Sequence, residues 1–205
     1  VARAARGTGQ LVRGGIRDAD GFLALALLIS TIPVILAGLI FKLTGLVDAL
    51  RSIEVIGWTM LLFGLLLYYA DTRQPETRHA SGWRLKDALI MGLWQVLARI
   101  PGSSRAGITI TGARFLGYER HDAAKLAMIM SIPTILASGA LLSLDLIGAV
   151  TPGLLRDAAI AAGFAFIAAY GALALMIKLL SAVSFTPYVI YRVLLGLGLL
   201  AYAYS

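Results

Sequence analysis

The chain lacks cysteine altogether and has few charged side chains. Without cysteine it has no disulfide framework, no thiolate metal site and no cysteine nucleophile. Charged residues make up 14% of the 205 residues, against about 25% in soluble domains. So little polar surface cannot cover an ordinary soluble globule, a disordered chain or a solvated coiled coil, and these classes are excluded.

Apolar residues dominate instead. They account for 59% of the chain, and there are 22 glycines besides. This composition indicates an integral membrane protein whose partner is the lipid bilayer. The net charge of +7 reflects membrane topology rather than nucleic acid binding, because no polar stretch interleaves aromatic with basic residues.

Long uncharged runs predict five membrane-spanning helices. Residues 21–41 would rise about 1.5 Å each and just cross a hydrocarbon core of about 30 Å. Residues 1–20 form a basic tail or linker, and residues 21–205 form one transmembrane domain. The other four predicted spans are 55–70, 126–144, 158–177 and 187–204.

Residues 85–117 follow another pattern. Their apolar stretches, 88–98 and 106–113, are too short to cross the membrane, and RIPGSSR lies between them. Two short helices joined in this way are typical of a re-entrant hairpin, which must be buried by protein or line a wet cavity. The sequence therefore predicts an all-α membrane protein with about five transmembrane helices and one re-entrant hairpin.

The basic residues predict the orientation. If the hairpin returns to the side it left, one face collects most of them and is cytoplasmic, and the tip points toward the outer side. That face receives Arg3, Arg6, Arg13, Arg17, Arg73, Arg78, Arg84, Lys86, Arg114, Arg120, Lys125 and Lys178, whereas the other receives Lys42, Arg51 and Arg156.

The hairpin tip has the chemistry of an anion site. Pro101 ends the first helix and Gly102 permits the reversal. Ser103 or Ser104 then caps a helix that starts near Arg105. Free N–H groups, the positive end of the helix dipole and a guanidinium converge there, which suits phosphate.

The alternative is a plain turn whose arginine caps carbonyls or extends to the interface. Against it stands the cost of an arginine near the bilayer centre, about 2.5–3.5 kcal/mol on the lenient scale. Arg99 and Arg105, six residues apart, imply anionic or hydrogen-bonded partners. Gly107 and Thr109 extend the predicted phosphate site. Gln95 is expected to support it, or to make a helix–helix hydrogen bond.

The hairpin GLWQVLARIPGSSRAGITITGARFLGYER resembles the second signature of the undecaprenyl pyrophosphate phosphatases, GxxQxxAxxPGxSRSGxTIxxGxxxGxxR. SFTPYVIYR resembles the closing SFxPFxxYR segment of that family. Ala106 departs from the pattern, where serine is usual, and Leu126, Ala127 and Met128 replace FSF. The matching residues of the hairpin are Gly92, Gln95, Ala98, Pro101, Gly102, Ser104, Arg105, Gly107, Thr109, Ile110, Gly117 and Arg120.

The first signature of that family, EGxTEFLP followed by VSSTGH, does not occur in the chain. It supplies glutamates and a histidine for metal and acid–base chemistry. We expect it upstream of Val1, so that this chain is the second half of an inverted-repeat fold and is unstable or inactive alone. The resemblance implies a divalent cation, Mg or Ca, whose glutamate ligands are not in this chain.

The resemblance implies hydrolysis of undecaprenyl diphosphate in the bacterial inner membrane, with the active site toward the outer face. The reaction recycles the carrier for peptidoglycan synthesis and confers bacitracin resistance. Arg105 and Ser104 are the predicted catalytic residues, and Gly102, Ser103, Gly107 and Thr109 help to bind phosphate. The alternative function is a polyprenyl-phosphate carrier or flippase without hydrolysis, and a homo-oligomer stays open.

Other polar residues offer weaker candidates. Arg192, inside the last span, is predicted to pair with Asp145, to bind a substrate phosphate, or to extend to the interface, and the sequence does not choose. His79 and His121 are assigned to solvated loops. We expect no metal site to be assembled from this chain alone.

Overall fold

The computed structural model describes residues 19–145, 152–180 and 184–205. They form two compact units, one reaching to Thr134 and including Ser184–Ser205, the other covering Ile135–Val183. Each unit is considered by itself. The predicted basic tail, residues 1–20, lies almost entirely outside the described residues.

The described residues are helical and contain no strand, only an isolated bridge between Arg78 and Tyr118. Five helices are long and apolar enough to cross a membrane, which confirms the five predicted spans. The helices extend beyond the predicted runs because their ends continue into interfacial polar residues. In chain order, all the helices of the described residues are α2 (Ala19–Thr44), α3 (Leu46–Ala49), α4 (Ile53–Arg73), α5 (Leu85–Val96), α6 (Arg105–Phe115), α7 (Arg120–Asp145), α8 (Pro152–Leu180) and α9 (Thr186–Tyr204), with 3-10 turns η1 (Ala80–Gly82) and η2 (Leu97–Arg99).

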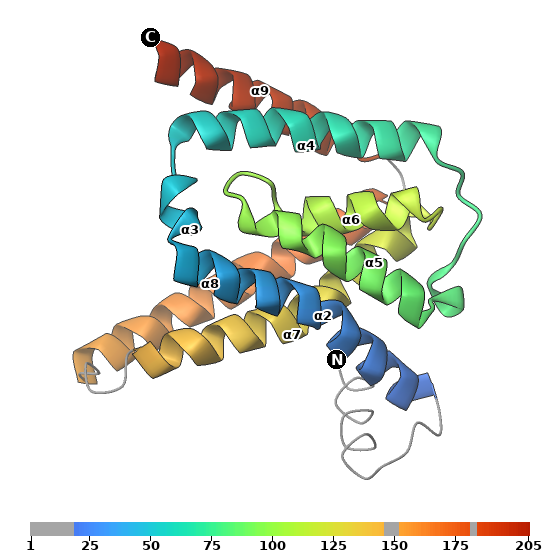
Figure 1. The fold of residues 1–205 in the computed structure, drawn as a ribbon, viewed down its shortest axis with the longest axis horizontal. Helices are drawn as coiled ribbons and strands as arrows, with labels where there is room; N and C mark the ends of the chain where they lie inside the picture. The colour runs from blue at the N-terminus through green and yellow to red at the C-terminus, as the bar shows by residue number, and fades with distance from the viewer. Residues whose placement is uncertain (1–18, 146–151, 181–183) are drawn as a thin grey trace. The chain divides into compact units, whose positions relative to one another are not determined.

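The larger unit is built around the short helices α5 and α6. Helix α6 contacts α4, α4 contacts α9, and α5 contacts α2, so that the hairpin lies between two long helices (Figure 1). Glycine allows the closest approach. A Cβ on Gly92 of α5 would lie 2.4 Å from the carbonyl oxygen of Ser30 in α2, a distance that only a missing side chain permits.

The hairpin is re-entrant, as predicted. Its helices have 12 and 11 residues, about 18 and 16 Å at 1.5 Å per residue, too short to cross the bilayer. Its two ends meet again: the Tyr118 hydroxyl donates to Asp87 Oδ2 at 2.8 Å, and Glu119 N donates to the Arg78 carbonyl at 3.0 Å. The chain therefore returns to the side from which it entered.

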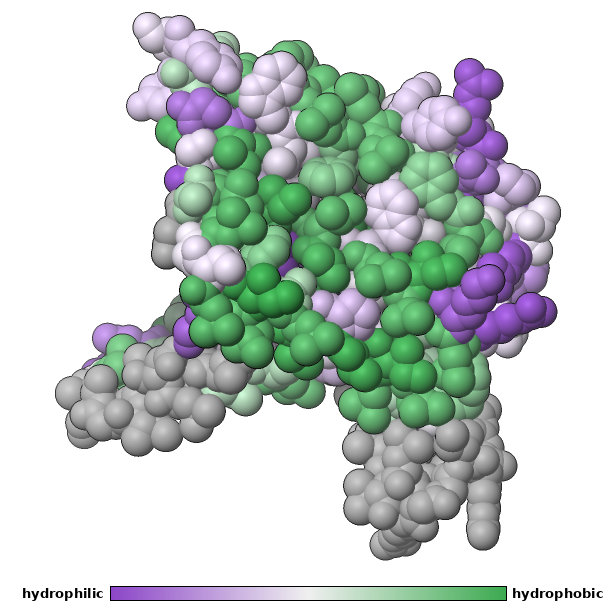
Figure 2. Space-filling model, in the orientation of Figure 1, coloured by the Kyte–Doolittle hydropathy of each residue, from purple (hydrophilic) through white to green (hydrophobic). Residues whose placement is uncertain are grey.

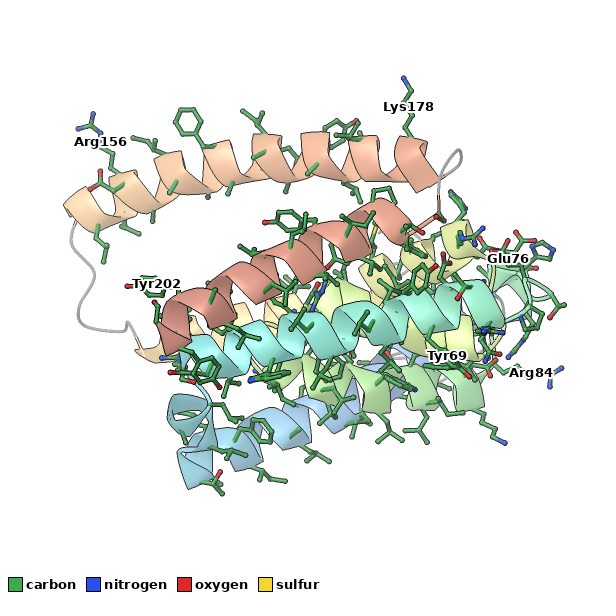
Figure 3. All side chains as sticks on the ribbon, turned by 90° about the horizontal axis from the view of Figure 1, so that it is seen from above. Tyr69, Glu76, Arg84, Arg156, Lys178 and Tyr202 are labelled. Carbon is green, nitrogen blue, oxygen red and sulfur yellow. The ribbon has the colours of Figure 1, made fainter. Side chains whose placement is uncertain are left out.

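Charged residues cluster at this base of the hairpin. Asp71, in the last turn of α4, lies 2.8 Å from Arg120 Nε and 3.3 Å from Arg114 Nε. Glu76 adds ion pairs of 3.4 Å to Arg114 and 3.0 Å to Arg120. Figure 3 shows Glu76 and Arg84 at one end of the helices and Tyr202 at the other. Apolar residues cover most of the face in Figure 2, with a hydrophilic edge at one side.

The smaller unit contains the end of α7, from Ile135, and helix α8. Helix α8 contains the predicted span 158–177, and its 23 residues from Gly153 to Leu175 are long and apolar enough to cross a membrane. The unit carries no part of the hairpin tip.

Candidate functional site at the hairpin tip

The tip is a tight turn from Ile100 to Ser104. The Ser103 amide and hydroxyl both donate to the Ile100 carbonyl, at 3.3 and 2.7 Å. Gly102 has a φ of +82°, which glycine adopts without strain. The turn thus places Ser104 and Arg105 at the start of α6.

Of the two predicted caps, the structure chooses Ser104. Its Oγ accepts a hydrogen bond from Gly107 N at 3.3 Å, the pattern of an N-cap. Its φ is +65°, the one positive value at a non-glycine among the described residues. Such a conformation costs about 1–3 kcal/mol and persists only where the surroundings enforce it. Strain of this kind concentrates at functional sites.

Two long helices hold the turn in place. Thr59 of α4 donates from Oγ1 to the Pro101 carbonyl at 2.6 Å. A Cβ on Gly102 would lie 2.3 Å from Thr59 Oγ1, so the turn packs directly on α4. From α9, Arg192 Nη2 donates to the Gly102 carbonyl at 2.8 Å. The backbone of the tip is therefore fixed from two sides.

Arg192 also orients a second α9 side chain toward Ser104. Its Nη1 donates to the Tyr188 hydroxyl at 3.2 Å, and that hydroxyl donates to Ser104 Oγ at 2.9 Å. Arg192 is only 3% exposed, and its Nε is buried without a partner. Sequence reasoning left the role of Arg192 open and missed Tyr188. The available signal was the match of SFTPYVIYR to a family segment.

Arg105 occupies the first position of α6. It is half-buried, and no acceptor for its guanidinium occurs among the described residues. An arginine guanidinium stays protonated in proteins, so Arg105 carries its positive charge at the tip. Arg99 Nη2 makes one long contact, 3.4 Å to the Val34 carbonyl.

Two guanidinium groups lie at this turn, those of Arg105 and Arg192. In the part of the chain that the structure describes, neither of them has a carboxylate partner. Buried positive charge without a counter-charge is costly, and a bound anion would offset it. Together with the N–H groups that begin α6, this arrangement suits phosphate oxygens.

The remaining predicted residues lie at different distances from this turn. Gly107 faces it, since a Cβ there would lie 3.4 Å from both Ser104 Oγ and the Tyr188 hydroxyl. The Thr109 hydroxyl donates to the Arg105 carbonyl at 2.9 Å. Gln95, fully buried, donates from Nε2 to Thr134 Oγ1 at 3.1 Å, which is a helix–helix hydrogen bond. Its Oε1 has no partner.

One group in the described chain has the ligand set for a metal ion, but it lies elsewhere. His79, Glu119 and Asp122 place ligand atoms within 4.8 Å of one another. They lie at the base of the hairpin, one α6 length from the tip, and His79 pairs with Glu119 at 3.3 Å. Around the tip the described polar groups are arginine guanidiniums, hydroxyl groups and backbone amides. These fit an anion and do not fit a cation.

Comparison with known proteins identifies relatives of the whole chain. The protein-family model described as "Bacitracin resistance protein BacA" matches residues 2–198. Proteins named undecaprenyl-diphosphatase from Roseobacter denitrificans and Dinoroseobacter shibae are both 63% identical over all 205 residues, and the chain covers 77% of each. One of the same name from Hahella chejuensis is 42% identical over 193 residues, 94% of this chain and 72% of the relative.

Proposed function

This chain belongs to the BacA family of bacitracin resistance proteins, and we propose that it works as a membrane phosphatase on undecaprenyl diphosphate. Water attacks the terminal phosphorus, the bridging P–O bond breaks, and the products are undecaprenyl phosphate and inorganic phosphate. Relatives named for this hydrolysis at 63% identity favour it over a carrier or flippase.

The observation that carries the proposal is the hairpin tip. A strained serine, the N-terminus of α6 and Arg105 meet at one turn, and the guanidinium has no protein acceptor among the described residues. A diphosphate supplies the missing negative charge and planar oxygen pairs that match the guanidinium fork.

Each side chain at the tip then has a task. Arg105 binds the terminal phosphate and neutralises charge that develops during transfer. The first N–H groups of α6, including Gly107, and the Ser104 hydroxyl provide further hydrogen bonds. Gly102 and Ser103 shape the turn, and Thr109 supports the first turn of α6. Gln95 acts at a distance by joining α5 to α7.

Arg192 and Tyr188 are positioning residues. Arg192 fixes the Gly102 carbonyl, and Tyr188 holds Ser104 Oγ. Because both come from α9, this helix sets the orientation of the turn relative to α4. A rigid turn keeps the phosphate donors aligned before substrate binds, which favours the transition state.

A divalent cation, Mg or Ca, commonly assists diphosphate hydrolysis. The described residues at the tip do not fit a cation. The carboxylates at the hairpin base are held by arginines or by His79. They belong to the structure of that end rather than to the tip.

The charge distribution supports an orientation with the tip toward the outer face of the inner membrane. The basic residues of the hairpin base then lie on the cytoplasmic side, as the positive-inside rule favours. In this orientation the enzyme regenerates the lipid carrier for peptidoglycan synthesis. Bacitracin resistance would result because the enzyme removes the diphosphate form of the carrier.

The test measures phosphate release from undecaprenyl diphosphate by the full-length protein in detergent micelles. We expect Arg105→Ala to lower kcat/KM by about 100-fold or more, the cost of losing one charge-stabilising donor. Arg156→Ala is the control, because it removes a positive charge from the other unit. Turnover that is equal in both variants contradicts the assignment of Arg105, and no release by the wild type contradicts the function.

A further inference from the structure

Gly107, in the first turn of α6, leaves a small space beside the hairpin tip. A Cβ at this position would lie 3.4 Å from Ser104 Oγ, 3.4 Å from the Tyr188 hydroxyl and 3.5 Å from Arg192 Nη1. Polar atoms from the start of α6 and from α9 therefore surround the point where any other residue has its first side-chain carbon. A glycine whose nearest neighbours are polar leaves room for a polar ligand atom to approach the backbone.

Ser104 and Tyr188 form a hydroxyl pair that has one proton to spare. Ser104 Oγ accepts from Gly107 N at 3.3 Å, and the Tyr188 oxygen accepts from Arg192 Nη1 at 3.2 Å. The two hydroxyls bond each other at 2.9 Å, which uses one of their two protons. No acceptor for the other proton occurs among the residues that the structure describes, so that proton is available to an oxygen of a ligand. Tyr188 is 38% exposed, and a ligand can reach the pair.

Arg192 makes the space beside Gly107 positively charged. The residue is 3% exposed, its Nε is buried without a partner, and no carboxylate pairs with it in the described part of the chain. Its Nη1 carries two hydrogens, of which one goes to Tyr188. An anion that takes the remaining donors would offset this buried charge. The space therefore suits a negatively charged oxygen that only accepts hydrogen bonds, as a phosphate oxygen does.

We propose that the space beside Gly107 holds a non-bridging oxygen of the substrate phosphate, and that Tyr188 is a further substrate-binding residue. This role of Tyr188 rests on the proposed function of the tip, and it adds a contact that positioning of Ser104 does not require. Arg105 and the hydroxyl pair then bind one phosphate from two helices. In the family segment SFxPFxxYR a phenylalanine stands where this chain has Tyr188, so the resemblance by itself does not assign the hydroxyl.

The first variant, Tyr188→Phe, removes the hydroxyl and keeps the ring. We expect kcat/KM for undecaprenyl diphosphate to fall about 10-fold or more, the effect of losing one hydrogen bond to a charged group. Calorimetry on the full-length protein in detergent micelles should show a similar rise in the dissociation constant of farnesyl methylenediphosphonate, a diphosphonate that cannot be hydrolysed. Tyr202→Phe is the matched control and should change neither constant, because Tyr202 is 72% exposed and lies about 21 Å further along α9.

A second variant fills the space and leaves the three polar side chains in place. Gly107→Ala puts a methyl group 3.4 Å from the two hydroxyls, an ordinary van der Waals contact, and alanine favours a helix more than glycine does. The variant should be at least as stable as the wild type to SDS, yet should bind the diphosphonate about 10-fold more weakly. A purely structural role for Gly107 predicts no such loss of affinity at full stability. Gly198→Ala, where a Cβ meets nothing within 4 Å, is the control and should leave binding unchanged.

A third comparison separates contact with the phosphate from positioning of Ser104. Glycine accepts the positive φ of residue 104, so Ser104→Gly removes the hydroxyl without adding backbone strain. In this background the Tyr188 proton is free for the phosphate, and Tyr188→Phe should still weaken diphosphonate binding. No further loss in the double variant would reduce Tyr188 to a positioning residue and overturn the proposal.

Unchanged diphosphonate affinity in a folded Tyr188→Phe or Gly107→Ala variant would also overturn the proposal, as would absence of binding by the wild type. SDS unfolding of each variant establishes that it is folded. Binding needs no turnover, so these results are obtained even if the wild type releases no phosphate, the outcome that contradicts the proposed function. Normal hydrolysis with unchanged affinity in both variants leaves the proposed function intact and removes this role of Tyr188.

Discussion

The buried carboxylate of Asp71 offers the sharpest test of how the hairpin is held. Its side chain is 1% exposed and faces two arginines, Arg114, which is fully buried, and Arg120. Its second oxygen accepts from Phe185 N at 3.4 Å, at the start of α9. One side chain thus joins the ends of α4, α6, α7 and α9.

Asp71→Asn keeps the shape and removes the charge, so the two arginines would face a neutral amide. Breaking a buried ion pair from one side costs about 3–5 kcal/mol. The lower end applies here, because Arg114 keeps backbone carbonyl acceptors at Asp71, Gln74 and Tyr118, at 3.0, 3.2 and 2.6 Å. We expect a loss of about 3 kcal/mol in the free energy of unfolding.

The control is Glu76→Gln. Glu76 pairs with the same arginines, but its side chain is 38% exposed, and such pairs contribute at most about 1 kcal/mol. Unfolding by SDS in mixed micelles, followed by circular dichroism, measures both variants. Equal losses would refute the reasoning that burial of Asp71 decides its weight. KM in the folded fraction of Asp71→Asn should stay unchanged, because the phosphate site lies at the other end of α6.

Two further predictions concern the hairpin. Burial raises the pKa of the Asp87 carboxyl, but hydrogen bonds from Arg78 and Tyr118 outweigh it, and the net pKa lies below its ordinary value. The lowered pKa stabilises the fold above the unfolded value of about 3.9, and this contribution disappears as the pH falls through the folded value. Stability measured from pH 6 to pH 3, a range of about three units, should therefore drop less steeply in Asp87→Asn than in the wild type; parallel curves would contradict this. Gly92→Ala should destabilise by about 1–3 kcal/mol through overpacking, because its Cβ would meet the Ser30 backbone of α2, whereas Gly198→Ala should not; the same SDS titration compares them.

Tyr118, which donates a hydrogen bond to Asp87, also has a shifted pKa. Burial and the Asp87 carboxylate raise the pKa of the Tyr118 hydroxyl, so Tyr118 stays a hydrogen-bond donor at every physiological pH. The carboxylate accepts from Tyr118, from Arg78 and from Arg84 N. The base of the hairpin is therefore closed by one carboxylate with several donors, as buried charges require.

The sequence by itself determined the local features of this protein. The length of each apolar run is a local property, so the five spans and the two helices too short to span could be predicted. The same holds for the turn at Pro101 and Gly102 and for Arg105 at the start of a helix, because proline, glycine and helix ends act within a few residues. Family resemblance then indicated phosphate chemistry from those same contiguous residues.

Tertiary structure decided what depends on contacts between distant residues. Tyr188 and Ser104 are 84 positions apart, and Arg192 and Gly102 are 90 apart, so no local pattern reveals that α9 completes the tip. Arg99 of η2 lies against the backbone of Gly38 in α2, where a Cβ would be 2.5 Å from Arg99 Nη2, and this contact depended on the packing of α2 on the hairpin. In each case two helices had to meet before either side chain had a defined surrounding, which is the physical reason that sequence periodicity could not supply it.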